Sequence, residues 1–289
     1  MIDGKTAVCG LIGDPVEHTL SPVIHNTLAR ETGRNLVYVP FPVKAERVED
    51  AVKGAGALSL CGLNVTVPHK SAVIPFLKSV EREASLIGAV NTLVPEKDGY
   101  RGYNTDLTGL ERAFASDGVK IKGERVILLG AGGAARAAAF LCALRGAEEI
   151  WLLNRTLSRA EDLADEVNRA AGRDCVKPLR LSDWERIPEG RYLAVQGTKV
   201  GLAPDVEHAP IEEERFYRLI HTGYDLIYRP ARTTFMRLVE NAGGRAFNGL
   251  KMLLYQGVEA YELWTGIRVE EEQARVCYER MEKELRRDE

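Results

Sequence analysis

Two hydroxyl side chains near the start of the chain have the type and spacing of an anion-binding site. Thr19 and Ser21 lie two residues apart, beside an expected helix start at Ser21-Pro22. Hydroxyls and free N–H groups at a helix start suit a carboxylate or a phosphate. Alternatively, Ser21 only caps its own helix, with Pro22 at the first helical position.

A second polar cluster is the segment Asn64-Val-Thr-Val-Pro-His-Lys70. Alternation along an extended strand places Asn64 and Thr66 on one face and the valines on the other. Lys70 follows just beyond the strand end, where binding sites of α/β proteins tend to lie. The alternative is an edge strand with a wet face and a solvated lysine.

A third cluster joins the segment Gly88-Ala-Val-Asn91-Thr92 to the segment Asn104-Thr105-Asp106. Asp106 precedes an apolar repeat of helical period, so capping that helix is an alternative to any role in binding.

A glycine-rich turn further along the chain predicts a dinucleotide site. The apolar run 126–129 is typical of a buried strand, and Gly130, Gly132 and Ala135 give the spacing G-x-G-x-x-A before an alanine-rich helix. The first glycine permits a tight turn, and the second lets a diphosphate approach the backbone. The small third residue lets the helix pack close to the strand.

The end of the next strand, residues 150–153, distinguishes the two nicotinamide cofactors. An NAD site places an acidic residue there to bind the ribose 2′-hydroxyl. This chain instead has Asn154-Arg155-Thr156 followed by Arg159. Two guanidiniums suit a doubly charged 2′-phosphate, and they are unfavourable at a helix start without an anion. We therefore expect NADP.

The elements that must position these clusters alternate between strand and helix. Before the glycine turn we expect strands at 6–13, 35–43, 63–67 and 89–94, a helix starting at His69 or Lys70, and a hairpin at Asp98-Gly99. This order predicts the α/β class, with a mostly parallel sheet and an antiparallel edge. The charged C-terminal tail is expected to be a helix with Cys277, Met281 and Leu285 on one stripe.

Composition excludes several classes of protein. The 289 residues include 39 Lys and Arg against 42 Asp and Glu, so no basic excess indicates nucleic acid or an anionic membrane. Five scattered cysteines show no metal-ligand spacing, which predicts reduced cysteines, no metal and a cytoplasmic location. Neither a secretory signal nor a membrane span is expected.

In combination and in this order, the motifs G-D-P-V-x-H-[ST]-x-S-P, N-V-T-V-P-H-K, G-A-V-N-T and N-T-D-x-x-G resemble the shikimate dehydrogenase family. The resemblance runs from Gly13 to about Gly257. It implies an N-terminal substrate domain (1–105), a Rossmann-like NADP domain (106–247) and C-terminal helices that return to the first domain (248–289). It also implies reversible reduction of 3-dehydroshikimate to shikimate by a monomer or homodimer.

The resemblance assigns roles to individual residues. Lys70 and Asp106 would be the catalytic pair. The substrate would contact Thr19, Ser21, Asn64, Thr66, Asn91, Tyr228 and Gln256. The cofactor would contact Gly130, Ala131, Gly132, Gly133, Ala134, Asn154, Arg155, Thr156, Arg159, Thr198 and Gly249.

Some positions depart from the family pattern. Thr19 replaces the usual serine, and Gln196, Gly197, Lys199 and Leu202 differ around Thr198. A quinate/shikimate dehydrogenase of relaxed specificity is therefore an alternative. A regulatory NADP-binding protein without turnover is another, although such a protein would not need both Lys70 and Asp106.

Overall fold

The computed structural model describes residues 2–287 as two compact units. The first unit comprises residues up to Gly109 together with Leu253 onward, and the second runs from Leu110 to Met252. Both boundaries fall inside helices, α4 (Thr105–Ser116) and α9 (Leu250–Thr265). Of the boundaries expected from the sequence, 105/106 falls after the first residue of α4 and 247/248 precedes α9.

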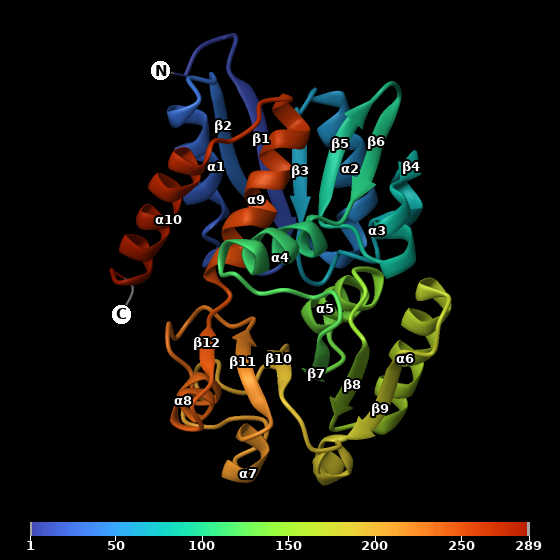
Figure 1. The fold of residues 1–289 in the computed structure, drawn as a ribbon. Helices are drawn as coiled ribbons and strands as arrows, with labels where there is room; N and C mark the ends of the chain where they lie inside the picture. Colours follow the sequence, from blue (N-terminus) through green and yellow to red (C-terminus); the bar gives the residue numbers. More distant parts are fainter. Residues whose placement is uncertain (1, 288–289) are drawn as a thin grey trace. The chain divides into compact units, whose positions relative to one another are not determined.

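The first unit is built on a six-stranded sheet with the order β2-β1-β3-β5-β6-β4 (Figure 1). β1 is parallel to β2 and β3, β5 is antiparallel to β3 and β6, and β4 is parallel to β6. The expected mostly parallel sheet is confirmed, but the expected antiparallel edge was wrong, because the antiparallel strand β5 lies inside the sheet between β3 and β6. The strands are β1 (Ala7–Gly13), β2 (Leu36–Pro42), β3 (Gly62–Val65), β4 (Ser79–Val80), β5 (Thr92–Glu96) and β6 (Gly99–Tyr103).

Helices pack on this sheet through apolar and small residues. Val48 and Val52 of α2 join Ile12, Leu63 and Val65 in a buried cluster. Helix α10 lies beside α1 and buries Cys277, Met281 and Leu285, as the sequence predicts. The helices of this unit, besides its parts of α4 and α9, are α1 (Ser21–Glu31), α2 (Val48–Ala57), α3 (Arg82–Ile87) and α10 (Glu271–Leu285).

Two local expectations were wrong. The chain forms turns after Pro68 rather than a helix, with only a short 3-10 turn at Ile74–Phe76. The backbone N–H of Val90 donates to the carbonyl of Lys70, so this segment is tied to a distant one as well as by turn hydrogen bonds of its own, such as that from Val73 to the carbonyl of His69. At α1, Leu20 rather than Ser21 is the N-cap, and no side chain caps the helix.

The second unit contains a fully parallel sheet with the order β12-β11-β10-β7-β8-β9. From β7 the chain adds β8 and β9 on one side, then returns to add β10, β11 and β12 on the other. This is the doubly wound Rossmann order, in which ligands bind beyond the carboxyl ends of the strands at the point of reversal. The strands are β7 (Arg125–Leu129), β8 (Glu149–Asn154), β9 (Val176–Arg180), β10 (Tyr192–Gln196), β11 (Ile220–Asp225) and β12 (Arg245–Phe247).

The helices of the second unit bury one face each against this sheet. Helix α5 is mostly alanine, and its buried residues allow a close approach to the strands. A second apolar cluster includes Trp184, Tyr217 and Phe235. The helices are α5 (Gly133–Leu144), α6 (Leu157–Ala171), α7 (Glu214–Tyr217) and α8 (Thr234–Asn241), with a 3-10 segment at Leu181–Arg186.

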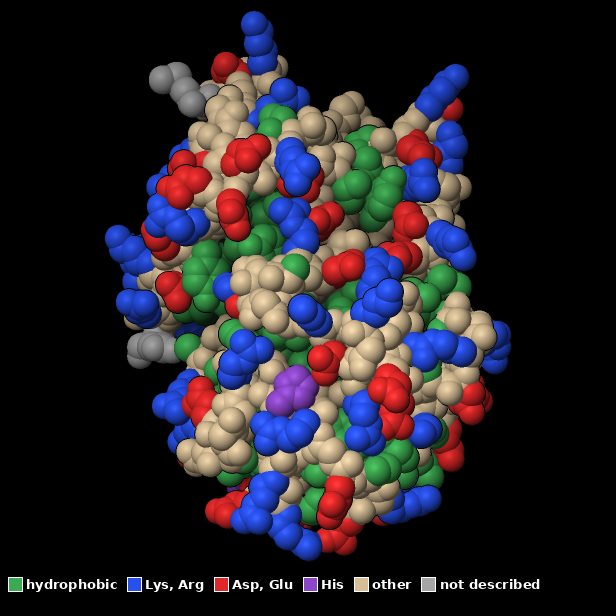
Figure 2. All heavy atoms as spheres, viewed as in Figure 1, with side chains coloured by type: hydrophobic (Ala, Val, Ile, Leu, Met, Phe, Trp, Pro, Cys, Tyr) green, Lys and Arg blue, Asp and Glu red, His purple; other side chains and the backbone are tan. Residues whose placement is uncertain are grey.

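Charged side chains of both signs are interspersed over the visible face of the protein (Figure 2). Across residues 2–287, no helix is long and apolar enough to cross a membrane. The same residues contain no group of three or more His, Cys, Asp or Glu placed to hold a metal ion.

Candidate active site

A lysine, a carboxylate and an amide meet in the first unit. Lys70 Nζ donates to Asp106 Oδ2 at 2.5 Å, and Asn91 Nδ2 donates to Asp106 Oδ1 at 2.9 Å. The side chain of Lys70 is 28% exposed and that of Asp106 is 14% exposed, so the pair is shielded but reachable. These three residues come from three separate segments, which belong to the second and third polar clusters of the sequence, and the fold brings them together.

Local structure leaves the Asp106 carboxylate free for this contact. Asn104 Oδ1 accepts from the backbone N–H groups of Asp106 and Leu107, so Asn104 caps α4. The alternative of Asp106 as the helix cap is therefore wrong. Asn91 is held in turn, because its Oδ1 accepts from the backbone N–H and the hydroxyl of Thr105.

The carboxamide of Asn64 is enclosed by protein groups. Its Oδ1 accepts from the Tyr38 hydroxyl at 2.8 Å and lies 3.1 Å from His25 Nε2. Its Nδ2 donates to the carbonyl of Asn91 and to the hydroxyl of Thr92. Four protein contacts satisfy this amide, which leaves it without a free hydrogen for a ligand.

His25 and its neighbours explain why Asn64 is fixed. The ring of His25 stacks on Tyr38, with 4.2 Å between the centroids. Burial lowers the pKa of His25 to about 3. Its Nδ1 is buried without a hydrogen-bond partner in the described chain. A proton on that nitrogen would be an unsatisfied donor, so the neutral ring with its proton on Nε2 is favoured.

Four other predicted substrate residues offer polar groups in the same unit. The hydroxyls of Thr19 and Ser21 lie 3.0 Å apart, with Thr19 donating, and the Thr19 oxygen accepts from the backbone N–H of Ser21 at 3.2 Å. The half-buried hydroxyl of Thr66 makes no hydrogen bond within residues 2–287. Gln256, on α9, is 9% exposed and donates to the carbonyl of Leu253.

Helices α4 and α9 cross closely at Gly109. A Cβ atom added at Gly109 would lie 2.5 Å from the backbone nitrogen of Gln256. Only glycine permits this approach, which fixes Gln256 relative to the helix that carries Asp106. The sequence analysis missed this residue, since the glycine of N-T-D-x-x-G was noted only as part of a motif.

The glycine turn in the second unit has the geometry its spacing predicts. Gly130 has φ +103°, a conformation that favours glycine, and β7 ends directly before it. Gly132 is the N-cap of α5, and residues 132–134 are exposed. Ala135 is fully buried and faces Gly197, where an added Cβ would lie 2.8 Å from the Cβ of Ala135. The open helix start therefore presents unpaired N–H groups to a ligand.

The arginines near the end of β8 are exposed and lack partners. Arg155, Arg159 and Arg180 form no hydrogen bond or ion pair within the described residues. Arg180 ends β9 and is paired in register with Asn154 of β8, so it lies beside the start of the Asn154-Arg155-Thr156 segment. The sequence analysis did not single out Arg180, because only strand pairing places it next to Arg155.

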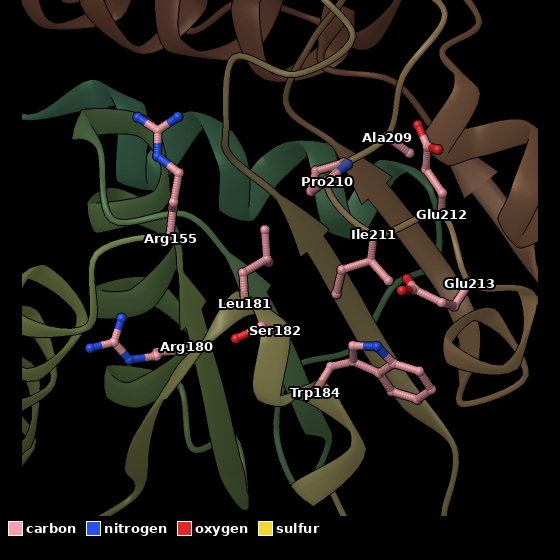
Figure 3. A pocket seen from close by; sticks show the side chains of 10 residues that line it. All are labelled: Arg155, Arg180, Leu181, Ser182, Trp184, Ala209, Pro210, Ile211, Glu212 and Glu213. Atoms are coloured by element: carbon pink, nitrogen blue, oxygen red, sulfur yellow. The ribbon is translucent and has the colours of Figure 1, made fainter.

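Arg155 and Arg180 line one side of a cavity of about 560 Å³ (Figure 3). Leu181, Ser182 and Trp184 form its floor, and residues 209–213 form the other side. The basic groups on one wall suit a phosphate, and the indole and aliphatic groups suit a flat organic ring, while the carboxylates of Glu212 and Glu213 lie on the wall opposite the arginines.

The segment after β10 differs in sequence from the family pattern, and hydrogen bonds made by Gln196 stabilise it. Gln196 Oε1 accepts from the backbone N–H of Thr198 at 2.5 Å, and Gln196 Nε2 donates to Asp225 Oδ1 at 3.3 Å. Asp225 also accepts from the hydroxyl of Thr233. Burial raises the pKa of Asp225 to about 7. Gln196 thus replaces the usual residue with one that braces the Thr198 turn.

Two further residues that the sequence predicted for the site, Gly249 and Tyr228, lie in the second unit. Gly249 contacts the carbonyl of Leu226 so closely that an added Cβ would lie 2.2 Å from that oxygen. Tyr228 follows β11 in the second unit, and burial raises its pKa. A role of Gly249 in cofactor binding and of Tyr228 in substrate binding stays a prediction.

Family models match three stretches of the chain. They are the shikimate dehydrogenase substrate binding domain at residues 11–93, shikimate / quinate 5-dehydrogenase at 112–182 and the shikimate 5′-dehydrogenase C-terminal domain at 249–275. A shikimate dehydrogenase (NADP(+)) of Methanothermobacter thermautotrophicus is 42% identical over 273 residues, which cover 92% of this chain and 93% of that protein. The chain belongs to the shikimate dehydrogenase family.

Solved structures of the family share the whole fold. A shikimate dehydrogenase crystallised with NADP+ is 34% identical and covers 99% of this chain and 98% of its own, with a TM-score of 0.89. A quinate dehydrogenase from Corynebacterium glutamicum in complex with NAD is 27% identical, covers 96% of this chain and 99% of its own, and has a TM-score of 0.87. The expected fold class is confirmed, and the family includes members with different substrates and cofactors.

Proposed function

We propose that this chain is an NADP-dependent shikimate dehydrogenase, which interconverts 3-dehydroshikimate and shikimate. The observation that carries the proposal is the contact between Lys70 and Asp106 in the unit that matches the family's substrate-binding domain. The relationship to an NADP(+)-dependent shikimate dehydrogenase at 42% identity supports it.

Lys70 is proposed to move the proton in this reaction. NADP(H), when bound, supplies or accepts the hydride at C3 of the substrate. Conversion between a ketone and an alcohol at C3 requires a proton at the attached oxygen, and a positioned ammonium group can donate it. In the reverse direction the neutral amine accepts the proton from the alcohol.

Asp106 is proposed to orient Lys70 and to contact the same substrate oxygen. Its two carboxylate oxygens are held by Lys70 and by Asn91, so the carboxylate has a fixed plane.

The remaining polar groups are proposed to bind the substrate. Thr19 and Ser21 suit its carboxylate because their hydroxyls lie together at the start of α1, where the Thr19 oxygen also accepts from the backbone N–H of Ser21. Thr66, Asn91 and Gln256 would bind ring hydroxyls. For Asn64 we propose an indirect role, in which its satisfied amide holds Asn91 and Thr92 in place.

The cofactor is proposed to lie across the glycine turn of the second unit. Its diphosphate would meet the N–H groups at the start of α5, and Arg155 and Arg159 would bind the 2′-phosphate. The absence of a carboxylate partner for either arginine within the described residues supports this role. NADP is therefore preferred to NAD.

A quinate/shikimate dehydrogenase of relaxed specificity is the second candidate, because Thr19 departs from the family's usual serine and the family includes a quinate dehydrogenase with NAD. The deciding experiment follows NADPH or NADH absorbance with shikimate and with quinate, each with NADP and NAD. Preferred turnover of shikimate with NADP supports the first proposal. Comparable turnover of quinate supports the second.

A third candidate is a regulatory protein that binds NADP without turnover. Binding of NADP without reduction in any substrate and cofactor pairing would support it and contradict both enzymes. We also propose a cytoplasmic location and a monomer or homodimer, consistent with five free cysteines. Cell fractionation and sedimentation would check these points.

A further inference from the structure

Two of the five cysteines lie side by side in the sheet region of the first unit. Cys9 belongs to β1, and Cys61 directly precedes β3, which pairs with β1 in parallel. The backbone N–H of Cys61 donates to the carbonyl of Val8, so the two strands are hydrogen-bonded at this point. The two Sγ atoms are 2.6 Å apart. The sequence gives no sign of this pair, because 52 positions separate the residues.

We propose that Cys9 and Cys61 form a reversible disulfide, with Cys61 as the thiol that reacts first and Cys9 as the resolving thiol. An S–S bond is about 2.05 Å long, so closure requires a movement of only about 0.5 Å. Cys9 in β1 and Cys61, directly before the paired strand β3, are held next to each other by the hydrogen bond between Cys61 and Val8.

The environments of the two sulfurs assign the order of reaction. Cys61 is partly exposed, whereas Cys9 is fully buried. The hydrogen bond from Cys9, opposed by burial and helped by nearby Arg34, lowers the pKa of Cys61. The same contact, together with burial, raises the pKa of Cys9. Since the thiolate is the nucleophile, the exposed Cys61 attacks first.

A hydroperoxide is the oxidant that this arrangement suits. The Cys61 sulfur attacks one peroxide oxygen, the O–O bond breaks, and the remaining alkoxide or hydroxide leaves with a proton as alcohol or water. Cys9 then attacks the sulfenic sulfur of Cys61. The S–S bond forms, the S–O bond breaks, and water leaves with the proton of Cys9. Two thiols are oxidised by two electrons, and a dithiol reductant restores them by exchange.

The other cysteines lack this arrangement. Cys142, Cys175 and Cys277 are buried, and no second sulfur within hydrogen-bond distance accompanies any of them in the described residues. Burial raises the pKa of each of these thiols. They serve as internal controls for selective oxidation.

The disulfide would lie close to the proposed substrate site. Cys61 precedes Asn64 by three residues on the same stretch of chain, and Asn64 is bonded to the carbonyl of Asn91. The bond would join β3 to β1 without involving Lys70 or Asp106. This inference stands on the thiol geometry and is independent of the proposed enzyme activity.

The test uses the folded full-length protein. It is reduced, freed of reductant, treated with stoichiometric hydrogen peroxide, then denatured and alkylated. We expect reactive thiols to fall from five to three, with the loss of two hydrogen atoms from the intact mass and a linked Cys9–Cys61 peptide. Dithiothreitol should restore five thiols. Loss of Cys142, Cys175 or Cys277 first, or a disulfide between two chains, would overturn the proposal.

Variants separate the two roles. With Cys9→Ser, the sulfenic acid on Cys61 should persist and react with dimedone. With Cys61→Ser, the Cys9 thiol should survive the same treatment, while Cys142→Ser should behave as the parent. If Cys9 in the Cys61→Ser variant were oxidised as fast as in the parent, Cys61 would not be the attacking thiol. Circular dichroism checks that each variant folds, and the linked peptide in the parent needs no variant.

Discussion

Lys70 and Asp106 are joined by a 2.5 Å hydrogen bond, and the second carboxylate oxygen of Asp106 accepts from Asn91. One carboxylate therefore connects the turn segment that follows β3, the residue before β5 and the start of α4. Lys70 lies in a turn, and the hydrogen bond from the backbone N–H of Val90 to the carbonyl of Lys70 ties that turn to the segment before β5, which helps to hold the lysine in position.

Replacing the lysine should remove the proposed proton transfer. We expect Lys70→Ala to lower kcat about 10²–10⁴-fold, the range for loss of a general acid or base, with a smaller effect on KM. Steady-state kinetics of NADP reduction by shikimate measures both constants. Lys53→Ala is the matched control, because Lys53 is an exposed lysine paired with Glu49 on α2. Near-full kcat in Lys70→Ala would show that Lys70 is not the proton donor.

The arginines at the ends of β8 and β9 should bind the 2′-phosphate of the cofactor. Loss of one charge-assisted hydrogen bond costs about 1.5–3 kcal/mol, so we expect Arg155→Ala and Arg159→Ala to raise the KM for NADP roughly 10–100-fold. The KM for NAD should change little. We expect Arg180→Ala to give a smaller effect of the same kind, since Arg180 lines the cavity with Arg155. Equal losses for NADP and NAD would argue against phosphate recognition.

The control for this series is Arg169→Ala. Arg169 lies in the last turn of α6, and Arg159 lies in the first turn of the same helix. The Arg169→Ala substitution removes the same charge from the same helix, but away from the cavity, so the cofactor preference should stay as in the parent.

His25 should make the first unit less stable in acid. Burial lowers its pKa to about 3 in the folded state from 6.5, so only the unfolded chain takes up the proton below pH 6.5. The stability present above pH 6.5 is therefore lost as the pH falls from 6.5 towards 3. Between pH 8 and 5 the loss should be roughly 2 kcal/mol. Urea unfolding of the parent and of His25→Gln across this pH range measures the loss. A difference in unfolding free energy between the two proteins that stayed constant with pH would contradict the prediction.

Asp225 should make the second unit less stable as the pH rises, which is the opposite of the effect of His25 on the first unit. Its pKa is raised from 3.8 to about 7 by burial, so the folded state keeps the proton where the unfolded chain has lost it. Stability from this group is full below pH 3.8 and is lost as the pH rises towards 7. From pH 5 to 8, Asp225→Asn should gain roughly 3 kcal/mol relative to the parent. Urea unfolding of the parent and of Asp225→Asn over the same pH range tests this. If the stability of Asp225→Asn relative to the parent fell as the pH rose, the assignment would be refuted.

The crossing of α4 and α9 should tolerate no side chain at Gly109. A Cβ there would lie 2.5 Å from the backbone of Gln256, so Gly109→Ala must push the helices apart. We expect a loss of about 1–3 kcal/mol in unfolding free energy, together with a higher KM for shikimate. Thermal unfolding and kinetics measure the two effects.

Gly54→Ala is the matched control for that substitution. Gly54 lies inside α2, and an added Cβ would have no atom within 4 Å. Alanine is the better helix former by about 1 kcal/mol, so this variant should be slightly more stable than the parent. Destabilisation of both variants to the same degree would contradict the steric explanation for Gly109.

Short-range patterns in the sequence were enough to determine the main elements and the kind of cofactor turn. Residues 126–135 predicted a strand, a tight turn and a close-packed helix, because glycine spacing and apolar runs act locally. The ordered motifs predicted the family, and the comparisons confirmed it. The missing acid after β8 indicated NADP for the same local reason.

The tertiary structure alone decided which polar groups face one another. It showed that Asn104 caps α4, that Asn64 is satisfied by Tyr38 and its neighbours, and that turns rather than an α-helix directly follow Pro68. It also placed Arg180 beside Asn154 and Cys9 beside Cys61, pairs that only strand pairing creates. A hydrogen-bonding side chain can choose among many partners, and the choice depends on contacts between residues distant in the chain, which composition and spacing do not specify.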